Sequence, residues 1–233
     1  MKTHTLHLLS DRNLQVKNDW FSSQWWAGQG GLVGGAPGRG TTVFVRDGGR
    51  ELALRHYQRG GLFGRLLGDR YLWTGLENTR PWREWYLLAD LHSQGLPVPR
   101  PVAARCARSG LFYRADLLTE RLPGQPLAQW LADGPLAAEQ VEAVGRCIRR
   151  FHRAGVFHAD LNARNILLDA AGRVSLIDFD KGELRPPGAW QQQNLARLHR
   201  SLEKFQRQSQ QQNTSFHFNE TVWQAMLVGY EGD

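Results

Sequence analysis

A predicted β-hairpin with polar residues at both of its ends constrains the fold of this chain more than any other feature. Two short apolar runs, residues 166–168 and 174–177, flank a turn at residues 170–172 that contains a glycine. Short apolar runs on either side of such a turn predict a pair of antiparallel strands. A hairpin returns the chain to the place where it started, so we expect Asp178 to lie beside Asn165.

The polar segments at the ends of this hairpin carry groups suited to one kind of chemistry. The first segment reads HADLNARN (residues 158–165) and the second reads IDFD (residues 177–180). Asp160 offers a carboxylate that can accept a proton from a hydroxyl group, while Asn165 and Asp178 offer the hard oxygen ligands that Mg²⁺ prefers. Each residue alone would more often cap a turn or lie on a solvated loop. Their joint spacing around one hairpin favours a catalytic site.

The two segments resemble the catalytic loop H-R-D-L-x-x-x-N and the D-F-G metal site of protein kinases. The resemblance implies an ATP-dependent phosphotransferase, with Asp160 as the catalytic aspartate and with Asn165 and Asp178 holding Mg²⁺. Two positions differ from the family pattern: Asp180 stands in place of the glycine, and an alanine follows the histidine. We expect His158 to brace the loop and not to transfer protons.

The two halves of the chain have different patterns, and the order of these patterns predicts an α+β fold. Strand-like runs at 42–45 and 51–55 flank a turn at Asp47-Gly48-Gly49, whereas helical spacing dominates the second half, as in the stripe Val141, Val144, Ile148 and Phe151. With the kinase resemblance, the expected fold is protein-kinase-like and bilobal. A β-rich, ATP-binding N-terminal lobe would span residues 1–121, and a mainly helical catalytic lobe would span residues 122–233.

Further kinase elements are expected in the N-terminal half. Arg55 occupies the place of the lysine in the V-A-I-K strand. A helix is predicted from about residues 78–81 to Gly95, and on it Glu84 shares a face with several leucines. A buried acid needs a cationic partner, and the kinase resemblance implies that this partner of Glu84 is Arg55. The remaining residues expected to bind ATP are Gly38, Arg39 and Gly40 of a phosphate-covering loop, and Glu120 and Leu122 at the adenine-binding hinge.

Composition points to anionic partners. The formal net charge is +7, and 25 of the 29 basic residues are arginine, which binds phosphate oxygens through a planar fork. A GC-rich coding bias is the alternative explanation. The sequence shows no signal peptide, no apolar stretch long enough to span a membrane, no zinc-site spacing around its two cysteines, and no nucleic-acid recognition motif. We therefore expect a chain that is soluble or lies on a membrane surface.

Two features bear on the molecule that accepts the phosphate. Protein kinases carry a peptide-binding segment that ends in A-P-E, and no such segment follows Asp178, so a small molecule or a glycolipid is expected as acceptor. The insertion over residues 56–83 mixes arginines with aromatic residues, a combination suited to an anionic membrane surface. An ordinary amphipathic excursion that covers the lobe is the alternative.

Nearly the whole chain resembles the bacterial 3-deoxy-D-manno-octulosonic acid (Kdo) kinases of the lipopolysaccharide-core kinase group. The segments that carry this resemblance are GRGTT, RHYQRGGL, YLWTGLENTRPWREW, GLPVPRPVAA, FHADLNARNILLD, LIDFDKG and NLARLHRSLEK. The resemblance implies phosphorylation of the 4-hydroxyl of a Kdo sugar on a lipid A precursor, and peripheral attachment to the cytoplasmic face of the inner membrane. Two alternatives stay open. One is a kinase of the same fold that acts on a core heptose or another small molecule, and the other is a catalytically inactive, kinase-like binding protein.

Overall fold

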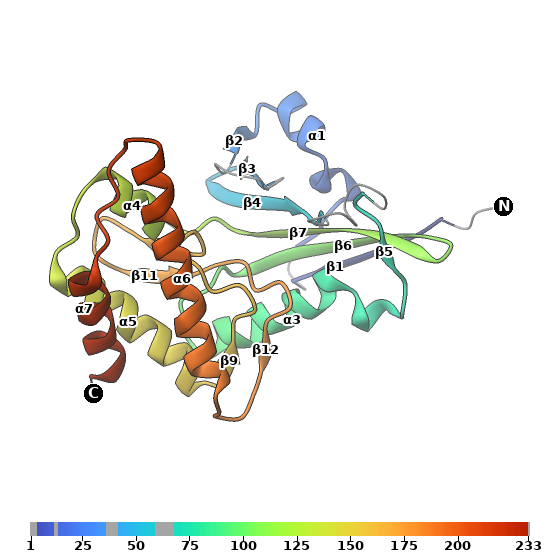
Figure 1. Ribbon diagram of the computed structural model, residues 1–233. Helices are drawn as coiled ribbons and strands as arrows, with labels where there is room; N and C mark the ends of the chain where they lie inside the picture. Colours follow the sequence, from blue (N-terminus) through green and yellow to red (C-terminus); the bar gives the residue numbers. More distant parts are fainter. Residues whose placement is uncertain (1–3, 12–13, 36–41, 59–67, 233) are drawn as a thin grey trace. The chain divides into compact units, whose positions relative to one another are not determined.

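The chain folds into two compact units. The structure, a computed structural model, describes residues 4–11, 14–35, 42–58 and 68–232. Unit 1 comprises Met1–Asp90 and Pro99–Arg121, and unit 2 comprises Leu91–Val98 and Leu122–Asp233 (Figure 1). The predicted phosphate-covering residues Gly38, Arg39 and Gly40 lie outside the described residues, as does part of the predicted insertion.

Unit 1 is built on an antiparallel sheet. Its strands, in spatial order, are β1 (His4–Ser10), β6 (Pro101–Ser109), β7 (Phe112–Glu120), β4 (Arg50–His56), β3 (Thr42–Asp47) and β2 (Leu32–Gly35), and β5 (Tyr71–Leu72) also pairs with β7. The predicted hairpin is present, because β3 pairs with β4 and Asp47 lies opposite Arg50. Gly48, in the two-residue turn, has φ of 59°, a conformation that glycine adopts without a steric penalty.

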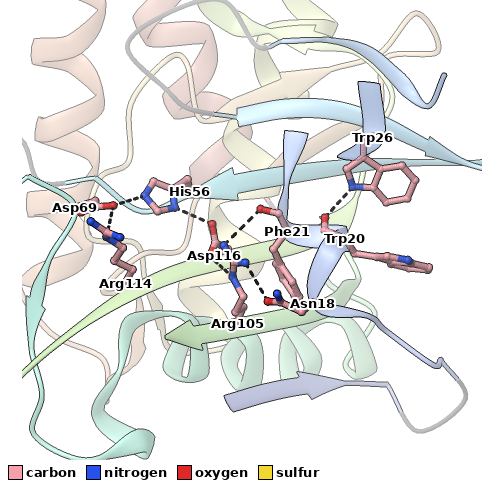
Figure 2. Close-up of polar contacts among 9 residues, drawn as sticks. All are labelled: Asn18, Trp20, Phe21, Trp26, His56, Asp69, Arg105, Arg114 and Asp116. Atoms are coloured by element: carbon pink, nitrogen blue, oxygen red, sulfur yellow. Dashed lines mark hydrogen bonds and ion pairs between the residues drawn. The ribbon is translucent and has the colours of Figure 1, made fainter. Parts of the chain in front are cut away.

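One end of this sheet is covered by two short helices, η1 (Asn18–Phe21) and α1 (Ser23–Gly28). Phe21 and Trp26 are buried there, and they share a core cluster with the sheet residues Val45, Leu52, Leu54, Val102, Ala103 and Leu118. The indole N–H of Trp26 donates to the carbonyl of Trp20 at 2.7 Å (Figure 2). The buried aromatic body and the satisfied polar edge together fix these helices on the sheet.

A network of charges also ties strands of unit 1 together (Figure 2). His56 of β4 lies between two carboxylates, with Nδ1 2.7 Å from Asp116 and Nε2 3.1 Å from Asp69. Arg105 of β6 binds the second oxygen of Asp116 at 2.8 Å, and Arg114 of β7 binds Asp69 at 2.8 Å. The hydrogen bond to Asp116 raises the pKa of His56, against the effect of burial. The network thus links three strands to the segment that follows β4.

Helix α3 (Arg80–Ser93) follows the short helix η2 (Leu76–Asn78). It begins within the predicted interval, and it ends two residues before Gly95, whose φ of 73° suits a helix terminus. Glu84, Leu88 and Leu91 of this helix are all buried. The predicted buried stripe, including its acidic member, is therefore present, except that Leu87, its third leucine, is only half-buried.

Unit 2 contains most of the helices. These are α4 (Leu127–Asp133), α5 (Ala138–Arg153), α6 (Trp190–Gln211) and α7 (Glu220–Glu231). The predicted stripe of α5 is buried, and this helix lies alongside α7 (Figure 1). The contact depends on two glycines: a Cβ atom on Gly145 would lie 2.0 Å from the carbonyl oxygen of Met226, and one on Gly229 would lie 2.1 Å from that of Glu142. Only residues without a side chain allow the two backbones to approach this closely.

The short strands of unit 2 include the hairpin predicted from the sequence. Strand β10 (Ile166–Leu168) pairs in antiparallel fashion with β11 (Val174–Leu176), and Ile166 lies opposite Leu176. The other strands are β8 (Gln125–Pro126), which joins β10, and β9 (Val156–Phe157), which pairs with β12 (Glu183–Leu184). Unit 1 thus holds the antiparallel sheet and unit 2 holds most of the helices. This agrees with the predicted mixture of strands and helices. Within the described ranges, no helix combines the length and apolar character needed to cross a membrane.

Candidate active site

The hairpin of unit 2 brings two of the predicted site residues together. The backbone N–H of Ile177 donates to the carbonyl oxygen of Asn165 at 3.0 Å, which extends the β10–β11 pairing by one residue. Asp178 follows Ile177 directly, so it returns beside Asn165. This placement confirms the expectation drawn from the two apolar runs and their turn.

The backbone at Asp178 adopts an uncommon conformation. Its φ is 65°, in the left-handed region that residues other than glycine rarely visit, although aspartate tolerates it better than most. The next residue, Phe179, is 1% exposed, and its ring lies 4.7 Å from that of His158 and 5.7 Å from that of Phe151. Burial of this ring holds the turn in place. Such backbone strain, of roughly 1–3 kcal/mol, concentrates at functional sites.

His158 links the two polar segments. Its Nδ1 accepts a hydrogen bond from the backbone N–H of Asp160 at 3.2 Å, and its Nε2 lies 3.0 Å from the carbonyl oxygen of Ile177. Because a backbone N–H must donate and a carbonyl must accept, the imidazole carries its proton on Nε2. Burial lowers the pKa of His158, which keeps the ring neutral. Both ring nitrogens are used within the protein, so His158 acts as the brace that the sequence predicts.

Asp160 presents an exposed carboxylate. One oxygen, Oδ1, accepts from the guanidinium of Arg197 at 2.8 Å, and the other, Oδ2, accepts from Asn162 at 3.1 Å. The side chain is 58% exposed, so a hydroxyl group from solution can reach it. The backbone carbonyl of Asp160 accepts from Nδ2 of Asn165 at 2.9 Å. This bond uses the nitrogen end of the Asn165 amide, so the oxygen end could serve as a ligand.

Helix α6 supports residues 158–165, the predicted catalytic segment, through one polar face. The buried side chain of Asn194 accepts from the N–H of His158 at 3.2 Å and donates to its carbonyl at 3.1 Å. One turn further, Arg197 binds Asp160, and another turn further, Ser201 accepts from the N–H of Ala163 at 3.3 Å. Spacings of three and four residues place all three side chains on one helix face. The segment is therefore held at three points by a single helix.

Sequence reasoning did not identify this supporting face. The pattern Leu195, Leu198, Leu202 and Phe205 predicts a helix with a polar outer face, and such a face is usually solvated. A signal was present, since Asn194, Arg197 and Ser201 each stand one residue before an apolar position of the stripe. Polar side chains at the border of a buried stripe can contact a neighbouring segment.

In unit 1, Arg55 and Glu84 form the expected ion pair. Glu84 is 3% exposed, and it also accepts from the hydroxyl of Tyr57 at 2.5 Å. The guanidinium of Arg55 lies 4.6 Å from the centre of the Tyr57 ring. Two charge-assisted bonds satisfy the buried carboxylate. Glu84 therefore has the cationic partner that an acid on a buried apolar stripe needs.

Two of the predicted hinge residues lie within the described ranges. Glu120 ends β7 opposite Leu52 of β4, and its carboxylate is 3.6 Å from the guanidinium of Arg100. Leu122 is the first residue of the second segment of unit 2, and it is half-buried. Their part in adenine binding stays a prediction.

Asn165 and Asp178 could hold a metal ion only together with ligands from outside the protein. Across the part of the chain that the structure describes, no group of three or more histidine, cysteine, aspartate or glutamate side chains could hold a metal alone. Asn165 and Asp178 supply one amide oxygen and one carboxylate. This set suits Mg²⁺, which is usually bound by one or two carboxylates together with phosphate oxygens and water.

Comparison with known proteins identifies close relatives over most of the chain. Residues 23–230 match the family model described as "Lipopolysaccharide kinase (Kdo/WaaP) family". A protein of Photobacterium profundum named 3-deoxy-D-manno-octulosonic acid kinase is 47% identical over 212 residues, which cover 91% of this chain and 88% of the relative. Proteins with the same name in Vibrio vulnificus and Mannheimia succiniciproducens are 45% and 42% identical, covering 91% and 95% of this chain and 88% and 93% of their own.

Proposed function

The chain belongs to the lipopolysaccharide kinase (Kdo/WaaP) family, and on this basis we propose that it transfers the γ-phosphate of ATP to the 4-hydroxyl of a Kdo sugar on a lipid A precursor. Relatives that share 42–47% of their residues with it are named as kinases of this sugar. The observation that carries the proposal is the exposed carboxylate of Asp160 beside the adjacent pair Asn165 and Asp178. A phosphotransferase needs both parts.

The geometry of unit 2 supports the roles proposed for its residues. Asp160 accepts the proton of the sugar hydroxyl as that oxygen attacks the γ-phosphorus, and ADP leaves. Asn165 and Asp178 hold Mg²⁺, which neutralises charge on the phosphates when it is bound. His158 fixes the backbone N–H of Asp160 and the carbonyl of Ile177, and so it orients the acid without exchanging protons itself.

Further residues are proposed to bind the nucleotide. Arg55 orients the phosphates, and Glu84 and Tyr57 hold its guanidinium in place. Gly38, Arg39 and Gly40 cover the phosphates, and backbone groups near Glu120 and Leu122 contact the adenine. The protein-kinase-like bilobal fold, with lobes over residues 1–121 and 122–233, belongs to this proposal. The antiparallel sheet of unit 1 and the helices of unit 2 support it.

The place of action is the cytoplasmic face of the inner membrane, to which the protein would attach peripherally. The net charge of +7 favours an anionic surface. In the described part of the insertion, the guanidinium of Arg80 lies 4.5 Å from the centre of the Tyr71 ring, and the neighbouring Leu72 is 56% exposed. Because the Tyr71 ring is itself buried, the exposed Leu72 is the side chain here that suits the interface between lipid headgroups and acyl chains.

A panel of acceptors tests the substrate assignment. Purified protein is incubated with ATP and Mg²⁺ and with a Kdo-bearing lipid A precursor, a heptose-bearing core acceptor, or neither. We expect one phosphate group on the Kdo acceptor and none on the heptose acceptor. Transfer to heptose alone would overturn the substrate, and binding of ATP without transfer to any acceptor would support an inactive, kinase-like binding protein.

A further inference from the structure

Helix α6 places a cation directly on the catalytic aspartate. We propose that this residue, Arg197, binds the carboxylate of the acidic sugar, and that it thereby makes the protein selective for a carboxylated acceptor. The inference rests on the proposed function and deepens it, because it assigns the recognition of the acceptor to a residue outside the catalytic and metal-binding set.

The position of Arg197 is fixed by its helix. Leu195 and Leu198 flank it in sequence and are 3% and 0% exposed, which anchors this turn of α6 in the core of unit 2. Asn194 and Ser201, on the same helix face, hold the catalytic segment by hydrogen bonds. The base of the Arg197 side chain is therefore held at a fixed position relative to Asp160. Its tip reaches Asp160 Oδ1 at 2.8 Å.

The guanidinium has hydrogen-bonding capacity beyond this contact. Arginine carries five N–H donors, and within the described residues a single one is engaged, by Asp160. The Arg197 side chain is 48% exposed, so a ligand from solution can reach it. An exposed ion pair is worth at most about 1 kcal/mol, so Arg197 can share Asp160 with an incoming anion or exchange it at little cost.

The chemistry of the acceptor requires such a group. During transfer, the sugar hydroxyl must come within about 3 Å of the Asp160 carboxylate, which brings the rest of the sugar ring close to Arg197. Kdo is an acid, and its carboxylate would be repelled by the charge of Asp160 unless a cation stood between them. Arginine binds carboxylates through two parallel N–H groups, which a neutral sugar such as heptose does not engage.

A second arginine, in the catalytic segment itself, is already engaged by an aromatic ring. Arg164 belongs to the same catalytic segment, but its guanidinium lies 5.0 Å from the centre of the Phe205 ring and stacks on that aromatic side chain of α6. Arg197 is the arginine that the structure places in contact with Asp160. Because of this contact, Arg197 is the candidate for binding a negatively charged group of the acceptor next to the reacting hydroxyl.

The experiment compares two acceptors: the Kdo-bearing lipid A precursor and the same molecule with its Kdo carboxylate converted to the methyl ester. Initial rates give kcat and KM for the wild-type protein, Arg197→Gln and Arg197→Lys. The control is Arg200→Gln, which makes the same change at an exposed position of the same helix. We expect the wild type to prefer the acid by about 10- to 100-fold in kcat/KM, the range of a charge-assisted hydrogen bond.

Arg197→Gln should use the acid and the ester equally, mainly through a higher KM for the acid. Arg197→Lys should keep part of the preference, and Arg200→Gln all of it. The inference is overturned if the wild type uses the ester as well as the acid, or if Arg197→Gln keeps the preference. An equal loss of kcat for both acceptors also overturns it, because the arginine would then act on Asp160 or the phosphoryl group. Absence of transfer by the wild type to the unmodified acceptor overturns the proposed function and this inference with it, whereas the other outcomes leave that function standing.

Discussion

The backbone N–H of Ile177 donates to the carbonyl oxygen of Asn165 at 3.0 Å, one residue beyond the β10–β11 hairpin. This single bond sets how close Asp178 comes to Asn165. Because both residues belong to one short hairpin, local strand pairing is enough to bring the two proposed metal ligands together. Their arrangement should therefore withstand substitutions elsewhere in unit 2 better than the arrangement of Asp160, which depends on helix α6.

Replacement of Asn194 by alanine tests that dependence. The change would leave the N–H and the carbonyl of His158 buried without their partner, at a cost of about 1–3 kcal/mol for each unsatisfied group. We expect the free energy of unfolding in urea to fall by about 2–4 kcal/mol. We expect kcat to fall as well, because Asp160 lies two residues after His158 and would be displaced with it. Gln193→Ala, at an exposed neighbouring position, serves as the control. Wild-type stability in Asn194→Ala would contradict the supporting role of α6.

Replacement of Glu84 by glutamine tests the buried pair of unit 1. The change removes the negative charge that Arg55 and Tyr57 share, and breaking one side of a buried ion pair costs about 3–5 kcal/mol. Arg55 is 20% exposed and can recover some hydration, so we expect a loss of about 2–4 kcal/mol and a higher KM for ATP.

The control for Glu84 is Glu51→Gln, on the exposed pairs with Arg46 and Arg121, which should leave both unfolding and KM unchanged. If Glu84→Gln lost stability while the KM for ATP stayed at the wild-type value, the pair would hold the fold and not the nucleotide.

The charge network around His56 predicts a dependence of stability on pH. The hydrogen bond from His56 to Asp116 raises the pKa of the imidazole in the folded protein. A raised folded pKa stabilises the protein fully below the unfolded value of about 6.5, and this contribution is lost as pH rises through the folded pKa. We expect the stability difference between the wild type and His56→Gln to be largest near pH 6 and to shrink by pH 9.

Chemical unfolding at the two pH values measures this difference. His92→Gln, at an exposed position near the end of α3, provides the matched control and should show no such trend. If the stability difference between the wild type and His56→Gln were the same at both pH values, the two carboxylates would not raise the pKa of the imidazole.

Local patterns predicted much of this structure. The hairpin that carries Asn165 and Asp178 follows from two apolar runs and a turn. The cost of burying an acid predicts that Glu84 has a cationic partner, and the resemblance to kinases identifies Arg55 as that partner. The contacts of Asn194 and Arg197 were missed because a polar residue on a helix is usually solvated, and only the tertiary placement of α6 turns it toward the catalytic segment. Strand β1 was missed for a similar reason, since it pairs with β6 about a hundred residues away and no local pattern reveals that partner.

The mass of the Kdo-bearing acceptor after incubation with ATP and Mg²⁺ tests the central claim most directly, when the wild type is compared with Asp160→Ala. The wild type should add one phosphate group to the acceptor. Asp160→Ala should be slower by about 10²- to 10⁴-fold, the contribution of a positioned acid or base. Because this side chain is 58% exposed, the variant should unfold at the same urea concentration as the wild type. Near-normal turnover by Asp160→Ala, or an acceptor whose mass the wild type leaves unchanged, would contradict the account.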